Sequence, residues 1–151
     1  MDVRARLDEL NLSLPVAALP VAAYVPAVRT GNLVFTAGQL PLVDGKIPYV
    51  GKVGGPVTPE QAKEMAQVCI LNALAAVELV APVDSIVKVV RVVGYVNGVS
   101  GFIAAPGVVN GASELLIEIF GEQGKHARSA FGVAELPLDA PVEVELTVEV
   151  V

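Results

Sequence analysis

Arg128 and Glu143 are the two residues whose types and spacing point most directly to chemistry. Arg128 lies near the start of a predicted strand, and Glu143 lies in the next one, beyond a Leu136-Pro137 turn. A guanidinium presents a planar fork of N–H groups that binds a carboxylate at two points. A glutamate can transfer a proton or hold a water molecule. If the two strands converge, the pair predicts a small concave site for a carboxylated ligand.

Each of these two residues also has an ordinary structural explanation. Arg128 is equally explained as the partner of a surface carboxylate. Glu143 alternates along its strand with Val142 and Val144, which point to the other side. A solvated polar face is the commoner origin of such alternation. Spacing alone therefore leaves both interpretations open.

The other candidates are His126, Tyr24 and Asn110. His126 follows Gly124-Lys125, where a surface or hydrogen-bonding histidine is commoner than a catalytic one. Tyr24 is explained equally by packing, and Asn110-Gly111 by a turn or a helix cap. Cys69 falls on an apolar helix face, which indicates a buried, inert thiol.

Composition indicates one domain that is rich in apolar residues. The chain has 151 residues, of which 54% are hydrophobic and 17% are charged. Its longest apolar stretch, 68–83, is interrupted by Asn72 and Glu78, so we expect no membrane span. The surplus of apolar residues is typical of subunit interfaces, and we expect an oligomer.

Charge and residue counts exclude several classes of protein. The formal net charge is -6 and no cluster of Lys and Arg occurs, which disfavours nucleic-acid binding. One His and one Cys are too few for a zinc site, and no phosphate-binding glycine motif has the required context, so no cofactor is expected. The lone Cys69 and the charged N-terminus, without a signal peptide, favour the cytoplasm.

Apolar periodicity and turn signals predict the order of the elements. A short helix over 3–10 and an extended segment over 12–23 come first. Thr58-Pro59 and Gln61 form a capping box at the start of a long helix. The predicted strands are 24–29, 33–36, 86–96, 128–135 and 142–150, and the predicted main helices are 58–80 and 112–120.

This order predicts an α+β fold in a single domain, with two main helices packed on one face of a mixed β-sheet. The opposite sheet face then needs another cover, and a partner subunit is the economical candidate. No repeat or second-domain boundary is visible in the sequence.

Four blocks of the sequence resemble the Rid family, also called the YjgF/YER057c/UK114 family. The first block is 24–41, which contains Gly38-Gln39-Leu40-Pro41. The helix that begins at Thr58 and the strand 86–97 are similar to the next two family elements. The last block runs from Ala127 through Leu136-Pro137 to Glu145. The likeness covers about 24–150, so the chain reads as one Rid-like domain, 1–151, with an N-terminal extension over 1–23.

The resemblance implies a chorismate-mutase-like fold of the bacillus type and a homotrimer with ligand clefts between subunits. It also implies hydrolysis of reactive enamines and imines, such as 2-aminoacrylate, to 2-oxo acids and ammonia. Arg128 would bind the substrate carboxylate and Glu143 would activate water. The residues implied to contact substrate are Tyr24, Asn110, and the backbone at Gly38 and Ala130; His126 is a further candidate.

The chain departs from the deaminase branch at several positions. Ala130 stands where that branch has cysteine, Ala37 stands where it has serine, and His126 is not typical of it. The connection 102–110 is also longer, so the chain resembles a divergent, longer subgroup. An alternative is a non-catalytic trimer that binds 2-oxo acids. Chorismate-mutase-type chemistry rests on fold analogy alone and needs more cationic residues, and the acidic charge argues against an endoribonuclease.

Overall fold

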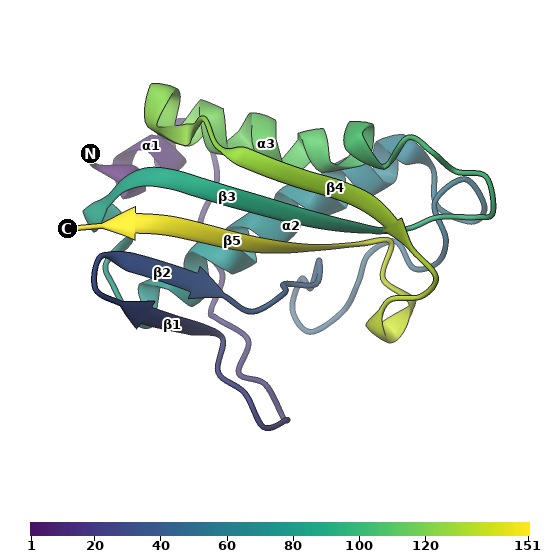
Figure 1. Cartoon of the computed structure of the whole chain (residues 1–151), viewed down its shortest axis with the longest axis horizontal. Helices are drawn as coiled ribbons and strands as arrows, with labels where there is room; N and C mark the ends of the chain where they lie inside the picture. Colours follow the sequence, from purple (N-terminus) through teal and green to yellow (C-terminus); the bar gives the residue numbers. More distant parts are fainter.

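The computed structural model describes residues 1–151 as one layer of helices on a five-stranded sheet (Figure 1). The sheet has the order β1-β2-β5-β3-β4, in which β3 and β4 are parallel and the other neighbours are antiparallel. The strands are β1 Ala27–Thr30, β2 Leu33–Thr36, β3 Ile86–Asn97, β4 Ala127–Val133 and β5 Val142–Val150. The helices are α1 Val3–Glu9, α2 Pro59–Glu78 and α3 Ala105–Phe120. The predicted α+β architecture is confirmed.

Local sequence signals fix the start of α2 and the hairpin before it. Thr58 Oγ1 accepts a hydrogen bond from the Gln61 N–H, and the Gln61 side chain accepts one from the Thr58 N–H, as the capping box predicts. Asp44 and Gly45 both have positive φ, at 50° and 78°, in a turn closed by the Val43–Lys46 bridge. That backbone conformation is the one that two-residue hairpins need.

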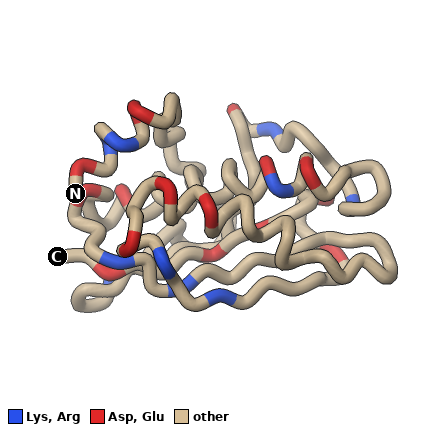
Figure 2. The backbone as a smooth tube through the Cα atoms, turned by 90° about the horizontal axis from the view of Figure 1, so that it is seen from above, with Lys and Arg blue, Asp and Glu red and all other residues tan.

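The hydrophobic core lies between the sheet and the helices. Alternate residues of β5 are buried, from Val142 to Val150, and they face the apolar side of α2. Seen from above, the helices form one layer and the strands the other, with charged residues of both signs scattered over both (Figure 2). α1 joins the core through Val3 and Leu7, whose side chains are fully or almost fully buried.

The start of α3 is the main error of the sequence prediction. We expected a helix over 112–120, because Asn110-Gly111 reads as a turn; the helix begins at Ala105, with Pro106 in its first turn. Gly111 has a packing role instead, since a Cβ on it would lie 2.1 Å from the Lys63 carbonyl oxygen of α2. The expected long connection 102–110 is therefore partly helical, and Asn110 lies inside α3.

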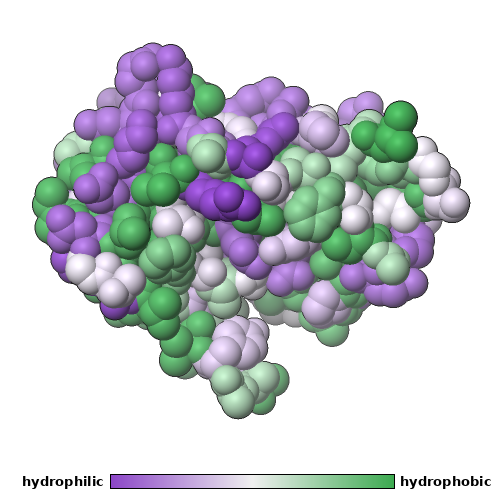
Figure 3. Space-filling model, in the orientation of Figure 1, coloured by the Kyte–Doolittle hydropathy of each residue, from purple (hydrophilic) through white to green (hydrophobic).

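The other face of the sheet has no cover within the chain. Phe35, Val28 and Phe131 are 40%, 51% and 47% exposed there, next to the polar residues of β5. Hydrophilic and apolar residues alternate across this face (Figure 3). The segment before β1 projects past the β1 edge of the sheet; we call it the apolar arm, because it exposes Val16, Leu19, Val21 and Val25. None of the helices has both the length and the apolar character needed to cross a bilayer.

Candidate functional site

Arg128 is held by α3 on the helix side of the sheet. Its strand neighbour is Val92, a fully buried residue, so Arg128 points toward the helical layer. The Arg128 Nη1 donates to Asn110 Oδ1 at 2.8 Å and to Ser113 Oγ at 3.3 Å. Asn110 and Ser113 lie three residues apart and so share one face of the helix. Arg128 and Asn110, two of the predicted site residues, are thus brought together.

These contacts leave a defined part of the guanidinium available. Nη1 carries two hydrogens, and both have acceptors in α3. Arg128 forms no salt bridge, and its Nε and Nη2 donate to no protein group. The Nε–H and one Nη2–H are parallel, which is the geometry that binds a carboxylate at two points. The Nε–Nη2 edge of Arg128 is therefore left without a partner in the chain.

His126 lies beside this group rather than on the outer surface. Its Nδ1 is 2.6 Å from the Gly124 carbonyl oxygen, and its Nε2 is 2.9 Å from Ser113 Oγ. Gly124 is buried against α3, where a Cβ would lie 2.4 Å from the Leu116 carbonyl oxygen. This close approach of the backbone brings His126 to Ser113. Ser113 was not among the predicted residues, and its i+3 spacing from Asn110 identifies it only once α3 is known to begin at Ala105.

Glu143 faces the open side of the sheet and is pressed against Gly38. A Cβ on Gly38 would lie 2.1 Å from Glu143 Oε1, so only glycine leaves room for the carboxyl group. Gln39 fixes this segment against β5, since its N–H donates to the Val144 carbonyl oxygen at 2.9 Å and its carbonyl accepts from the Val144 N–H. The buried Gln39 is a second residue that sequence reasoning missed.

The Glu143 carboxyl group is half-buried and has no hydrogen-bond partner in the chain. Burial, and to a smaller degree the charge of Glu145, raise its pKa above the ordinary value. Glu145 itself accepts a hydrogen bond from the Tyr95 hydroxyl at 2.7 Å. Burial and this bond raise the pKa of Tyr95 to about 12. A raised pKa on an unpaired carboxyl group is typical of residues that transfer protons.

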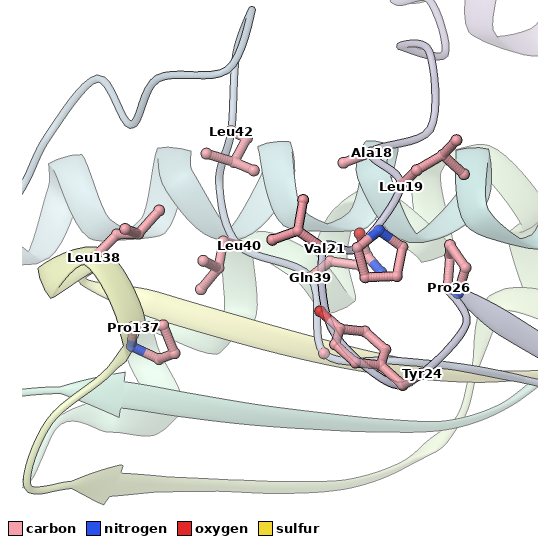
Figure 4. Close-up of a pocket in the computed structure, with 12 residues that line it drawn as sticks. Ala18, Leu19, Val21, Tyr24, Pro26, Gln39, Leu40, Leu42, Pro137 and Leu138 are labelled. Carbon is pink, nitrogen blue, oxygen red and sulfur yellow. The ribbon is translucent and has the colours of Figure 1, made fainter.

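A cavity of about 350 Å³ lies next to Gly38. Tyr24, Leu19, Val21 and Pro26 line one end, and Leu40, Leu42, Pro137 and Leu138 line the other (Figure 4). No charged side chain lines it, and the Tyr24 hydroxyl and the Gln39 amide are its polar side-chain groups. Tyr24 and Gly38, two of the predicted site residues, therefore line one cavity next to Glu143. Its lining suits an apolar group.

One chain does not bring Arg128 and Glu143 together. Arg128 is in register with Val92 and faces the helices, whereas Glu143 is in register with Tyr95 and faces the open side. β3 also lies between their two strands. The two strands, which are adjacent in the sequence, therefore do not converge on one site within a single chain. A crevice shared by both side chains needs a second protomer and stays a prediction.

The two remaining residues of interest are Ala130 and Cys69. Ala130 follows Arg128 on the same side of β4, opposite Gly94 of β3, and packs on the core. Cys69 is fully buried, as expected, and burial raises the pKa of its thiol. No group of three or more His, Cys, Asp or Glu side chains is arranged to hold a metal ion.

Comparison with known proteins gives consistent matches along almost the whole chain. Residues 4–150 match the family model described as "YjgF/chorismate mutase-like, putative endoribonuclease". Protein TCP17 of Trypanosoma cruzi is 37% identical over 97% of this chain and 93% of its own length. A 2-iminobutanoate/2-iminopropanoate deaminase of Dermatophagoides farinae is 32% identical over 89% and 91%. The crystal structure of Atu1372 from Agrobacterium tumefaciens, a protein of unknown function, has a TM-score of 0.90 and 41% identity, covering 99% of this chain and 92% of its own.

Proposed function

Because this chain belongs to the YjgF/chorismate mutase-like family, which is the Rid family, we propose that it is an imine and enamine hydrolase. Its substrates are small carboxylated intermediates of the 2-aminoacrylate type, and its products are 2-oxo acids and ammonia. The unpaired Glu143 carboxyl group beside Gly38 is the observation that carries this proposal. The relative named as a 2-iminobutanoate/2-iminopropanoate deaminase supports it.

In the proposed reaction the Nε–Nη2 edge of Arg128 binds the substrate carboxylate. Glu143 takes a proton from water while the water oxygen bonds to C2 of the imine, and the proton passes to the nitrogen. The resulting carbinolamine then passes its hydroxyl proton, through Glu143, to the nitrogen; the C–N bond breaks, ammonia leaves and the C2 carbonyl forms. The apolar part of the substrate lies in the uncharged cavity beside Tyr24.

We infer that the working site forms between protomers of a homotrimer. The geometry in one chain supports this inference, because Arg128 and Glu143 lie on opposite sides of the sheet and the open face exposes Phe35 and Phe131. A second protomer on that face would cover these side chains. For a shared site, that protomer must also bring its edge strand β4, which carries Arg128, near Glu143.

An amino-acid oxidase that generates imine in situ provides the test. We expect the wild-type protein to accelerate release of the 2-oxo acid, and Glu143→Gln to lower kcat by about 10²-fold or more, the usual contribution of a general base. Arg128→Ala should chiefly raise KM. If the wild type gives no acceleration but binds a 2-oxo acid, and Glu143→Gln binds it equally well, the protein is a binding protein and the hydrolase proposal is wrong.

A further inference from the structure

The hydrogen-bond chain behind Arg128 has a defined direction. The Gly124 carbonyl oxygen can only accept, so the His126 Nδ1 at 2.6 Å must carry a hydrogen and donate it. In the neutral imidazole the Nε2 is then an acceptor, and it takes the hydrogen of the Ser113 hydroxyl at 2.9 Å. The lone pairs of Ser113 Oγ are left for the Arg128 Nη1–H at 3.3 Å.

We propose that Ser113 and His126 are positioning residues that orient Arg128 for its carboxylate ligand. His126 fixes the direction of the Ser113 hydroxyl, and Ser113 with Asn110 occupies both hydrogens of Nη1. The guanidinium is thereby held with its Nε–Nη2 edge outward. The proposal rests on the role of Arg128 in the proposed function, and neither Ser113 nor His126 needs to touch the substrate.

His126 restricts what the Ser113 hydroxyl can do. Without His126, the hydroxyl of a helical serine commonly donates to the carbonyl four residues earlier, and it is no longer held in one rotamer. Linked hydrogen bonds also polarise one another, so the Nε2 acceptor makes Ser113 Oγ a better acceptor for Arg128. Gly124 is buried against the Leu116 backbone, where a Cβ would not fit, and this close approach places His126 next to Ser113.

The test combines two readouts on the full-length protein, namely imine turnover and calorimetric binding of 2-oxobutanoate. We expect Ser113→Ala and His126→Leu each to weaken binding and raise KM about fivefold, the effect of one net hydrogen bond, with kcat nearly unchanged. His126→Gln, whose amide oxygen can replace the Nε2 acceptor, should recover most of the loss. Ser85→Ala is the matched control, because the Ser85 hydroxyl also makes one hydrogen bond, donating to the Pro82 carbonyl oxygen at 2.6 Å, but it lies before β3 and outside the site.

A double-mutant cycle separates positioning from a general structural role. In an Arg128→Ala background, Ser113→Ala should cause no further loss of binding, because its effect passes through the guanidinium. An equal loss in both backgrounds, or none in the wild type, would overturn the proposal. Nitrogen-15 relaxation of the Arg128 Nε–H in the free protein gives a readout without ligand, and Ser113→Ala should increase its mobility.

Failure of this inference is distinguishable from failure of the proposed function. Turnover by the wild type with unaffected Ser113 and His126 variants would leave the hydrolase intact and remove the positioning role. If the Ser113 and His126 variants bind 2-oxobutanoate more weakly but the wild type turns over no imine, the positioning role stands and the hydrolase proposal is wrong. If the wild type neither binds 2-oxobutanoate nor turns over imine, both ideas are wrong.

Discussion

At the scale of single residues, the site depends on side chains whose surroundings set their chemistry. Glu143 is one glutamate among several on β5, and what sets it apart is contact with Gly38 and a pKa that burial raises. Arg128 is likewise distinguished by its hydrogen bonds to α3, which occupy Nη1 and leave Nε and Nη2 unpaired. Neither property is visible in residue type or spacing.

Gly38→Ala should lower activity while leaving the fold intact. The new Cβ would lie 2.1 Å from Glu143 Oε1, so the carboxyl group must move away from its place beside the cavity. We expect kcat to fall at least about tenfold, since misplacing a catalytic group by an ångström costs up to 10²-fold. Imine turnover and circular dichroism measure the two effects. Gly107→Ala, in open space on α3, is the control and should retain full turnover.

Glu143 should also give the stability of the protein a characteristic pH dependence. Its pKa is raised in the folded state, so the native protein keeps this proton at pH values where the unfolded chain has lost it. The free energy of unfolding should therefore fall as pH rises from the ordinary carboxyl pKa through the raised one. Glu143→Gln should be more stable than the wild type above that window and equal to it below. Urea unfolding across pH measures this, and parallel curves for both proteins would contradict it.

At the scale of elements, the packing of α2 against α3 places the groups that hold Arg128. The backbones of the two helices approach closely at Gly111, which lies directly after Asn110 and two residues before Ser113. A shift of α3 along or away from α2 would therefore move both anchors of the guanidinium. The position of Arg128 therefore depends on the contact between α2 and α3, although no catalytic residue lies in that contact.

Gly111→Ala tests this dependence. A Cβ there would lie 2.1 Å from the Lys63 carbonyl oxygen, which belongs to the backbone and cannot rotate away. We expect a loss of about 1–3 kcal/mol in the free energy of unfolding, as for other overpacked sites, together with weaker binding of a 2-oxo acid. Denaturant unfolding measures the loss. Gly107→Ala on the same helix should instead gain up to about 1 kcal/mol, because alanine favours the helix; equal effects of the two changes would argue against close packing.

At the scale of the whole molecule, the question is what covers the open face of the sheet. The T-shaped contact of Tyr95 with Phe131, with ring centroids 5.3 Å apart, lies on this face. Apolar surface of this kind, mixed with polar strand residues, is typical of subunit interfaces. The apolar arm before β1 extends the same surface past the edge of the sheet (Figure 3).

We expect a homotrimer in solution, so light scattering should give the mass of three chains of 15.6 kDa each. Phe131→Arg, which puts a charge on the open face, should reduce the mass to that of one chain and abolish imine turnover. Leu79→Arg is a matched control at the end of α2, since Leu79 is 52% exposed and Phe131 is 47% exposed. A trimeric, active Phe131→Arg protein would show that this face is not the interface.

The sequence by itself determined most elements and their layers, because the Thr58 capping box, the Asp44-Gly45 turn pair and apolar periodicity are local signals. It indicated the strand of Arg128 and the polar face of Glu143 for the same reason. It misplaced the start of α3, since Asn110-Gly111 has the local form of a turn and the reason for the glycine is the distant Lys63 backbone. Only the tertiary structure decided that Arg128 and Glu143 lie on opposite sides of one sheet, because strand order and register come from pairing between segments far apart in the chain.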